Sequence, residues 1–141
     1  MNIEDDSLLN SFLRTAYVLF PDGETILKEL CIRIGDNNHQ LLPILQTMNL
    51  TDWAFITAWN PQVQALSRTE NEERNQQLEK DLMPYAVFRG EGRPQLADDW
   101  EAEQSFWVPG IAEEEAIRLG RKYNQRAIIQ GKWNQARLVW L

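Results

Sequence analysis

Two asparagines in a long helical pattern have the spacing that most directly suggests a binding site. Asn71 and Asn75 fall on one narrow arc of a helix over residues 66–82, drawn at about 100° per residue. The same arc continues through Leu78 and Leu82, so this face packs inward. Burying an amide without partners costs roughly a few kcal/mol. We therefore expect both asparagines to hydrogen-bond to loops, water or a ligand near the start of this helix.

Two charged side chains flank that arc. Glu70 and Arg74 are four residues apart, a spacing at which opposite charges commonly pair on a helix surface, and an ion pair between them is the main interpretation. The alternative is that Arg74, or the N–H groups at the helix start, meets an anionic ligand. Both residues are therefore candidates for ligand binding.

A second source of chemistry is the alternating pattern over residues 100–108. It predicts a strand with Glu101, Glu103 and Ser105 on one face. Two carboxylates so placed could bind a cation or transfer protons, and Glu103 is the best candidate for a general base. Glu101 is more typical of a charge that keeps a sheet edge soluble.

The usual catalytic and metal-binding signatures are missing from the sequence. With one histidine, His39, and one cysteine, Cys31, neither a Ser-His-Asp nor a Cys-His set with an identifiable acid can be assembled. There is also no glycine-rich phosphate loop. We interpret His39 as a solvated residue and Cys31 as a small core residue in a reducing compartment. We assign no metal site, the cofactor is unknown, and an enzyme would need carboxylate chemistry or a bound metal.

The candidate residues follow a strand with little polar character. Residues 53–59 are apolar at nearly every position, which is typical of a central strand covered on both faces. Asn60 and Pro61 end it abruptly. The helix over residues 66–82 therefore starts near the carboxyl end of the strand, where α/β sheets bind ligands. We expect a pocket at this junction.

The other elements form the sheet and its cover. The patterns predict further helices over residues 7–13, 39–48 and 112–123, and further strands over residues 16–20, 25–34, 86–89, 127–129 and 136–141. Turns at residues 21–23 and at Gly131 make the first and last strand pairs into hairpins. Residues 90–99 form a loop that could cover the site. This order predicts a single α/β domain over residues 1–141, a mixed β-sheet with helices packed on it and terminal β-hairpins, with α+β as the alternative class.

The charge of the chain is acidic and unevenly placed. The formal net charge is −7; residues 91–115 carry 1 basic and 8 acidic side chains, and residues 116–141 carry 6 and 0. An acidic balance opposes non-specific attraction to nucleic acid and to anionic lipid. The acidic start is unlike a secretory signal, and no apolar run has bilayer-spanning length. We expect a cytoplasmic protein without a membrane partner.

Several polar motifs occur in a fixed order along the chain. They are Thr-Ala-Trp-Asn-Pro at residues 57–61, the two helix asparagines, Trp100 with Glu103 and Ser105 ahead of Gly110, and Gln125 with Ala127. This order resembles the uncharacterised bacterial family catalogued as domain of unknown function 3293, over roughly residues 15–130. Asn124 stands where glycine is expected, and Arg126 where asparagine is expected. The resemblance implies no activity, but it marks six polar signature positions: Asn60, Asn71, Asn75, Glu103, Ser105 and Gln125.

Two functions remain open. The first is binding of a small polar or anionic ligand in the pocket at the end of the central strand, by Asn60, Glu70, Asn71, Arg74, Asn75, Glu103, Ser105 and Gln125. The alternative is an acidic protein-interaction module of the immunity or inhibitor type, whose surface over residues 91–115 engages a basic protein partner. Nucleic-acid binding by the C-terminal hairpin with Trp133 and Trp140 is less favoured. The polar signature could equally be a buried hydrogen-bond network that fixes the fold.

Overall fold

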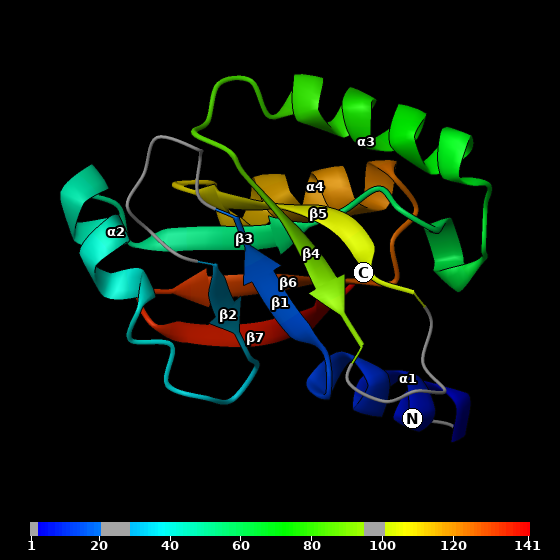
Figure 1. The fold of residues 1–141 in the computed structure, drawn as a ribbon, viewed down its shortest axis with the longest axis horizontal. Helices are drawn as coiled ribbons and strands as arrows, with labels where there is room; N and C mark the ends of the chain where they lie inside the picture. The colour runs from blue at the N-terminus through cyan, green and yellow to red at the C-terminus, as the bar shows by residue number, and fades with distance from the viewer. Residues whose placement is uncertain (1–2, 21–28, 95–100) are drawn as a thin grey trace.

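A computed structural model of the chain describes residues 3–20, 29–94 and 101–141 (Figure 1). Within these ranges the helices are α1 (Ile3–Leu13), α2 (Leu41–Met48), α3 (Arg68–Asp81) and α4 (Glu113–Lys122), with a 3-10 turn η1 (Pro61–Val63). The strands are β1 (Ala16–Leu19), β2 (Leu30–Ile32), β3 (Asp52–Ile56), β4 (Phe88–Arg93), β5 (Glu103–Pro109), β6 (Ala127–Lys132) and β7 (Gln135–Trp140). These seven strands form one sheet in the order β2-β1-β4-β5-β3-β6-β7.

The predicted sheet with helices packed on it and hairpins near both ends is confirmed. β1 pairs with β2, and β6 pairs with β7, in each case antiparallel. The remaining pairings of the described strands are antiparallel as well, so the sheet is antiparallel and not mixed as predicted, which corresponds to the α+β alternative. The turn expected at residues 21–23, and the strand residues expected before Glu29, lie outside the described residues.

β3 is an interior strand, as its apolar sequence predicts. It lies between β5 and β6, and Trp53, Ala54, Phe55 and Ile56 are all buried. Their side chains alternate between two clusters of buried residues, one on each face of the sheet. The chain leaves the sheet at the carboxyl end of β3. This end is the junction at which the sequence predicts the site.

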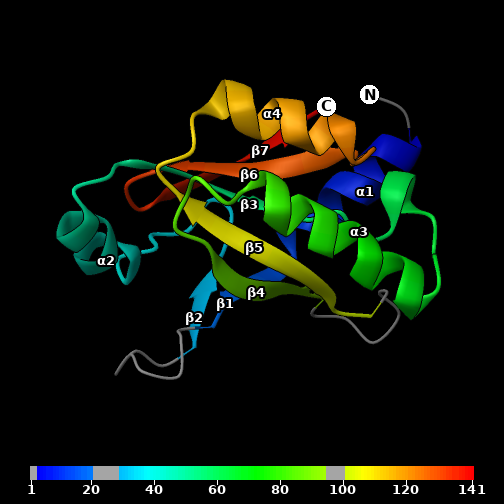
Figure 2. The same cartoon turned by 90° about the horizontal axis from the view of Figure 1, so that it is seen from above.

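Helices cover both faces of the sheet. α3 and α4 lie on the same side (Figure 2), where Leu78 and Leu119 pack against residues of β3, β5 and β6. On the other face α2 contributes Leu41 and Leu45 to the second cluster, and α1 lies far from α2 along the molecule (Figure 1). None of the helices in the described ranges is long and apolar enough to cross a membrane.

Two predictions about the strands at the site are wrong. Residues 90–93 belong to β4 rather than to a covering loop, because they pair with both β1 and β5; residues 95–100 lie outside the described residues. β5 is not an edge strand, since it lies between β4 and β3. Glu101 is exposed and precedes β5, so it protects no sheet edge.

Two other predictions fail because of strand position. Cys31 is exposed, since β2 is the last strand at its end of the sheet and one of its sides faces solvent. Gly131 lies within β6 and not in the turn, and a side chain there would overlap the ring of Trp53. The hairpin turn is formed instead by Trp133 and Asn134, which lie between β6 and β7.

Candidate functional site

The chain leaves β3 through residues 57–60, whose backbone is held by side chains from other elements. Asn75 on α3 is 5% exposed and bridges this segment to β5. Its Oδ1 accepts the N–H of Ala58 at 2.8 Å, and its Nδ2 donates to the carbonyl of Gln104 at 2.8 Å. Asn75 thus satisfies a buried N–H that neither a helix nor a strand supplies with a partner.

Asn71 makes the equivalent contacts one turn earlier on α3. Its Oδ1 accepts the N–H of Asn60 at 2.8 Å, while its Nδ2 donates to Oδ1 of Asn60 at 2.8 Å. The same Asn60 oxygen accepts the N–H of Leu66 at 3.0 Å. Asn60 adopts the left-handed conformation, with φ 46°, which asparagine tolerates better than most residues. The helix therefore fixes both the backbone and the side chain of Asn60.

Arg74 and Gln125 hold the carbonyls of the same segment. Arg74 donates from Nε to the carbonyl of Ala58 at 2.8 Å and from Nη2 to that of Tyr123 at 2.5 Å. Gln125 donates from Nε2 to the carbonyl of Trp59 at 3.2 Å. We call Asn71, Arg74, Asn75 and Gln125 the loop clamp, because together they bind the backbone of residues 58–60.

The predicted ion pair between Glu70 and Arg74 is wrong. Glu70 is exposed and accepts the N–H of Ser67 at 3.3 Å, while Ser67 Oγ accepts the N–H of Glu70 at 3.2 Å. This is a capping box that satisfies N–H groups at the start of α3. The structure therefore uses Glu70 to begin the helix and Arg74 to hold the loop, and it does not bring Glu70 to the site.

The loop clamp brings the side chain of Asn60 to Glu103, on β5. Asn60 Nδ2 donates to Glu103 Oε1 at 3.4 Å. Burial raises the pKa of Glu103 to about 7, and the hydrogen bond from Asn60 only partly offsets this rise. Glu103 is therefore a carboxyl group that changes its charge near neutral pH and can accept or donate a proton.

Glu103 lines a cavity of about 70 Å³ on the face of the sheet that α1 covers. Three other predicted site residues also line it: Asn60, Ser105 and Gln125. The rest of the wall comes from α1, β1, β3, η1, β4, β6 and residues next to them: Phe12, Thr15, Tyr17, Phe55, Ile56, Thr57, Val63, Gly92, Arg126, Ala127, Ile128 and Ile129. The sequence left two interpretations of the polar signature open, a pocket and a hydrogen-bond network. Both features occur here, next to each other.

The rim of the cavity is strained. Gln62 and Val63 both have positive φ, at 53° and 60°, which is rare for any residue except glycine and rarer for a β-branched one. Gln62 is held through its N–H and its side chain, which both donate to the carbonyl of Asn124, at 2.8 and 3.0 Å. Backbone strain of this kind clusters at functional sites.

Some residues of the site escaped the sequence analysis. Tyr17 and Thr15 come from β1 and the residue before it, which carry no motif, and only the strand alternation could have indicated that Tyr17 points inward. Asn124 was identified only as a departure from an expected glycine. Asn124 has a φ of 56°. This value explains why either the expected glycine or the observed asparagine fits here, because these two residues tolerate the left-handed conformation best.

Within the described ranges, no group of three or more His, Cys, Asp or Glu side chains is arranged to hold a metal ion. His39 is exposed and bonds to Asn37. The chemistry that the arrangement can perform is hydrogen bonding and proton transfer by Glu103, in a site whose geometry the loop clamp fixes beforehand.

Comparison with known proteins gives one match. The model of a family described as "Protein of unknown function (DUF3293)" matches residues 56–128, which is just over half of the chain. No curated protein matches the chain. No solved structure matches it either.

Proposed function

Since the chain belongs to the DUF3293 family, and the matched residues include Asn60, Glu103 and the loop clamp, we propose that the Glu103 cavity binds a small polar ligand. Glu103 and Asn60 contact this ligand directly. The loop clamp acts indirectly, because it fixes the backbone that carries Asn60. Ser105 and Thr57 add polar groups to the wall.

The observation that carries this proposal is the position of Glu103. A carboxyl group shielded from water is costly unless it is paired or hydrogen-bonded. Within the described residues, Glu103 has one side-chain hydrogen bond, the 3.4 Å contact from Asn60. By contrast, each amide of the loop clamp bonds to backbone at 2.8 to 3.2 Å. Glu103 thus retains hydrogen-bonding capacity that a ligand can use.

The contacts favour a neutral or cationic polar ligand over an anionic one. Arg74, the cation expected to meet an anion, donates to two backbone carbonyls instead. The start of α3 is closed by its own capping box. An anion entering the cavity would also approach Glu103, whose ionised form repels it.

Proton transfer is the chemistry that Glu103 can add to binding. With a pKa of about 7 it is available as both acid and base at neutral pH. The role of general base therefore rests with Glu103, and we assign no reaction class to the site.

A thermal-shift screen of small polar compounds tests the proposal, because a ligand that binds only the folded state raises Tm by mass action. The panel contains alcohols, amides, amines and carboxylates of two to four carbon atoms. We expect stabilising compounds to lose their effect in Glu103→Ala and to keep it in Glu101→Ala, which removes an exposed glutamate two residues away. An equal effect on both variants, or no stabilising compound at all, would contradict the proposal.

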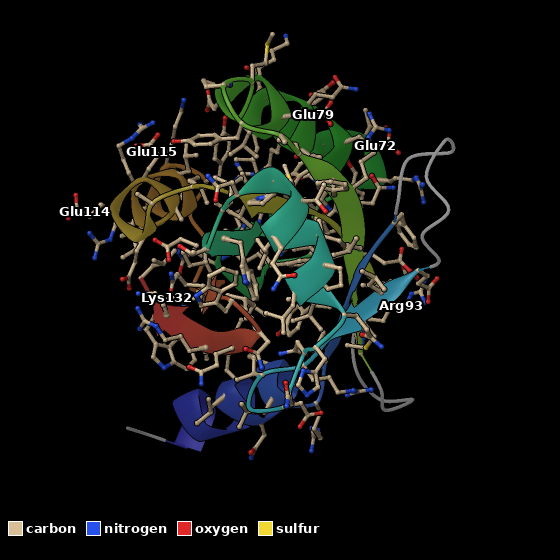
Figure 3. The ribbon with its side chains drawn as sticks, turned by 90° about the vertical axis from the view of Figure 1, so that its left-hand side faces the viewer. Glu72, Glu79, Arg93, Glu114, Glu115 and Lys132 are labelled. Carbon is tan, nitrogen blue, oxygen red and sulfur yellow. The ribbon has the colours of Figure 1, made fainter. Side chains whose placement is uncertain are left out.

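A second candidate is a surface for a basic protein partner. Glu72 and Glu79 on α3 and Glu114 and Glu115 on α4 lie at the surface of the protein (Figure 3), and the net charge is −7. Three of these four glutamates form ion pairs within the protein, with Arg68, Arg89 and Arg118. These pairs weaken the negative potential of the surface. A complex held by this surface would weaken with added salt and with Glu72→Lys and Glu114→Lys, while the Glu103 cavity would be unaffected.

We also propose a reducing compartment such as the cytoplasm for this protein. The free thiol of Cys31 is exposed, and exposed thiols persist where glutathione and thioredoxin keep them reduced.

A further inference from the structure

The hydroxyl groups that line the Glu103 cavity all donate their protons away from it. Thr15 donates to the carbonyl of Ser11 at 2.7 Å, and Tyr17 donates to that of Phe12 at 2.9 Å. Thr57 donates to the carbonyl of Gln104 at 2.6 Å. Ser105 donates to the main-chain carbonyl of Glu103 at 3.0 Å. A hydroxyl has a single proton, so each of these groups offers the cavity only oxygen lone pairs.

The amide group of Gln125 also offers the cavity an acceptor. Gln125 directs Nε2 to the carbonyls of Trp59 and Tyr123, at 3.2 and 3.4 Å, which uses both amide protons and leaves Oε1 as its accepting end. Asn60 differs, because its Oδ1 already accepts from Leu66 and Asn71 and its Nδ2 donates to Glu103. Apart from Asn60 and Arg126, the polar side chains of the wall therefore offer acceptors, and the partner that matches them and the carboxylate of Glu103 is a donor.

The charge of the site points to a cationic donor. Burial raises the pKa of Glu103 and the hydrogen bond from Asn60 lowers it. Arg126 also lines the cavity and has interactions of its own within the protein. A buried carboxylate is stabilised most by an opposite charge within hydrogen-bonding distance. A bound cation would supply that charge.

The remaining wall is mainly apolar, and part of it is aromatic. Phe12, Tyr17 and Phe55 line it, with the rings of Tyr17 and Phe55 5.4 Å apart in an edge-to-face arrangement. Aromatic faces attract cations and cover the carbon atoms next to them. The cavity volume of about 70 Å³ is well below the roughly 300 to 1,000 Å³ of most small-molecule sites. The cavity therefore favours a small head group over a large polar ring.

From these observations we infer that the ligand of the Glu103 cavity presents a primary ammonium group on a short alkyl chain. The inference rests on the proposed function and deepens it, because it names the chemical class of the ligand. The three N–H bonds of the ammonium group donate to Glu103 and to oxygen lone pairs of the wall. The first carbon atoms of the ligand pack against the aromatic rings. When Glu103 is protonated before binding, the ammonium replaces that proton, which leaves to solvent.

Calorimetric titration with propylamine tests the inference, with propanol and propionate as neutral and anionic compounds of the same size. We expect propylamine to bind more tightly than either. Its affinity rises roughly tenfold from pH 6 to pH 8, because Glu103 must lose its proton first. At pH 6 the measured heat depends on the ionisation enthalpy of the buffer, since a proton is released. Glu103→Gln loses at least about tenfold in affinity, while Glu101→Gln retains it.

Nα-acetyl-lysine amide presents the same ammonium on a peptide unit and distinguishes two sources of the ligand. Tighter binding of this compound than of propylamine assigns the ammonium to a lysine side chain, and the reverse order assigns it to a free amine. Propanol or propionate binding at least as tightly as propylamine, with loss in Glu103→Gln, would overturn the ammonium inference and leave the proposed function standing. Binding of none of these compounds, nor of any compound in the thermal-shift screen, would overturn both.

Discussion

At the scale of single residues, Glu103 makes folding depend on pH in the opposite sense to a surface carboxylate. Its pKa is about 7 in the folded protein and near the usual 4.5 when unfolded. Between these values the folded state holds a proton that the unfolded state has lost, so stability falls as pH rises from about 4.5 to 7. At about 1.4 kcal/mol for each factor of ten in proton affinity, the total effect is roughly 3 kcal/mol.

Glu103→Gln removes this dependence. We expect the difference in unfolding free energy between the variant and the wild type to shift in favour of the variant by roughly 2 to 3 kcal/mol from pH 5 to pH 8. Urea unfolding at both pH values measures it. Glu101→Gln, at an exposed position, serves as control. A pH-independent difference for Glu103→Gln would mean that Glu103 stays well solvated.

Asn60 combines a left-handed backbone with four hydrogen bonds, made by its N–H and its side chain. Two substitutions separate these contributions. Asn60→Gly keeps the conformation and removes the side chain, while Asn60→Ala also adds the strain of a left-handed residue, about 1 kcal/mol. We expect Asn60→Ala to be the less stable of the two in urea unfolding. Equal stability would indicate that the loop changes conformation when the side chain is removed.

At the scale of elements, α3 acts mainly as the scaffold of the loop. Asn75→Ala leaves the buried N–H of Ala58 without a partner, which costs roughly 1 to 3 kcal/mol. Gln77→Ala changes an exposed residue of the same helix and is expected to alter stability by about 0.5 kcal/mol or less. Urea unfolding of both variants compares them. Similar values for the two would show that water replaces Asn75 in the loop.

The strained turn η1 makes a separate prediction. Val63 has a φ of 60° and is 42% exposed, so replacing it relieves strain and removes few contacts. Val63→Gly is expected to raise the unfolding free energy by up to about 1 kcal/mol. The reason is that the cost of the left-handed conformation for valine exceeds the cost of the entropy that glycine adds to the unfolded chain. Val63→Ala keeps a β-carbon and gains less. A loss of stability in Val63→Gly would show that apolar contacts at the cavity rim outweigh the strain.

At the scale of the whole molecule, carboxyl groups whose pKa values shift in opposite directions shape the pH dependence of stability. The hydrogen bonds from Lys122 and from Tyr123 lower the pKa of Asp81, which joins α3 to α4. A lowered pKa contributes stability that is lost as pH falls below about 3.8, whereas Glu103 removes stability above about 4.5. We expect the unfolding free energy to be highest between about pH 4 and 5. Guanidinium unfolding from pH 3 to 8 measures the curve, and Asp81→Asn should flatten only its acid side.

The sequence by itself determined the features that depend on neighbouring residues. Periodicity turned Asn71 and Asn75 inward with Leu78, because residues three and four apart share one face of a helix. Continuous apolar character placed the strand that begins at Asp52 inside the sheet, because only a strand covered on both faces can bury every side chain.

Tertiary structure alone decided what these side chains bond to, because the partners come from distant parts of the chain. Arg74 has a suitable partner in Glu70 by local spacing, yet it donates to a carbonyl 49 residues away. Asn60 and Glu103 are 43 residues apart and meet only because β5 is paired beside β3. The raised pKa of Glu103 results from the walls that several elements build around it. Burial of that kind belongs to the assembled fold and to no local stretch of sequence.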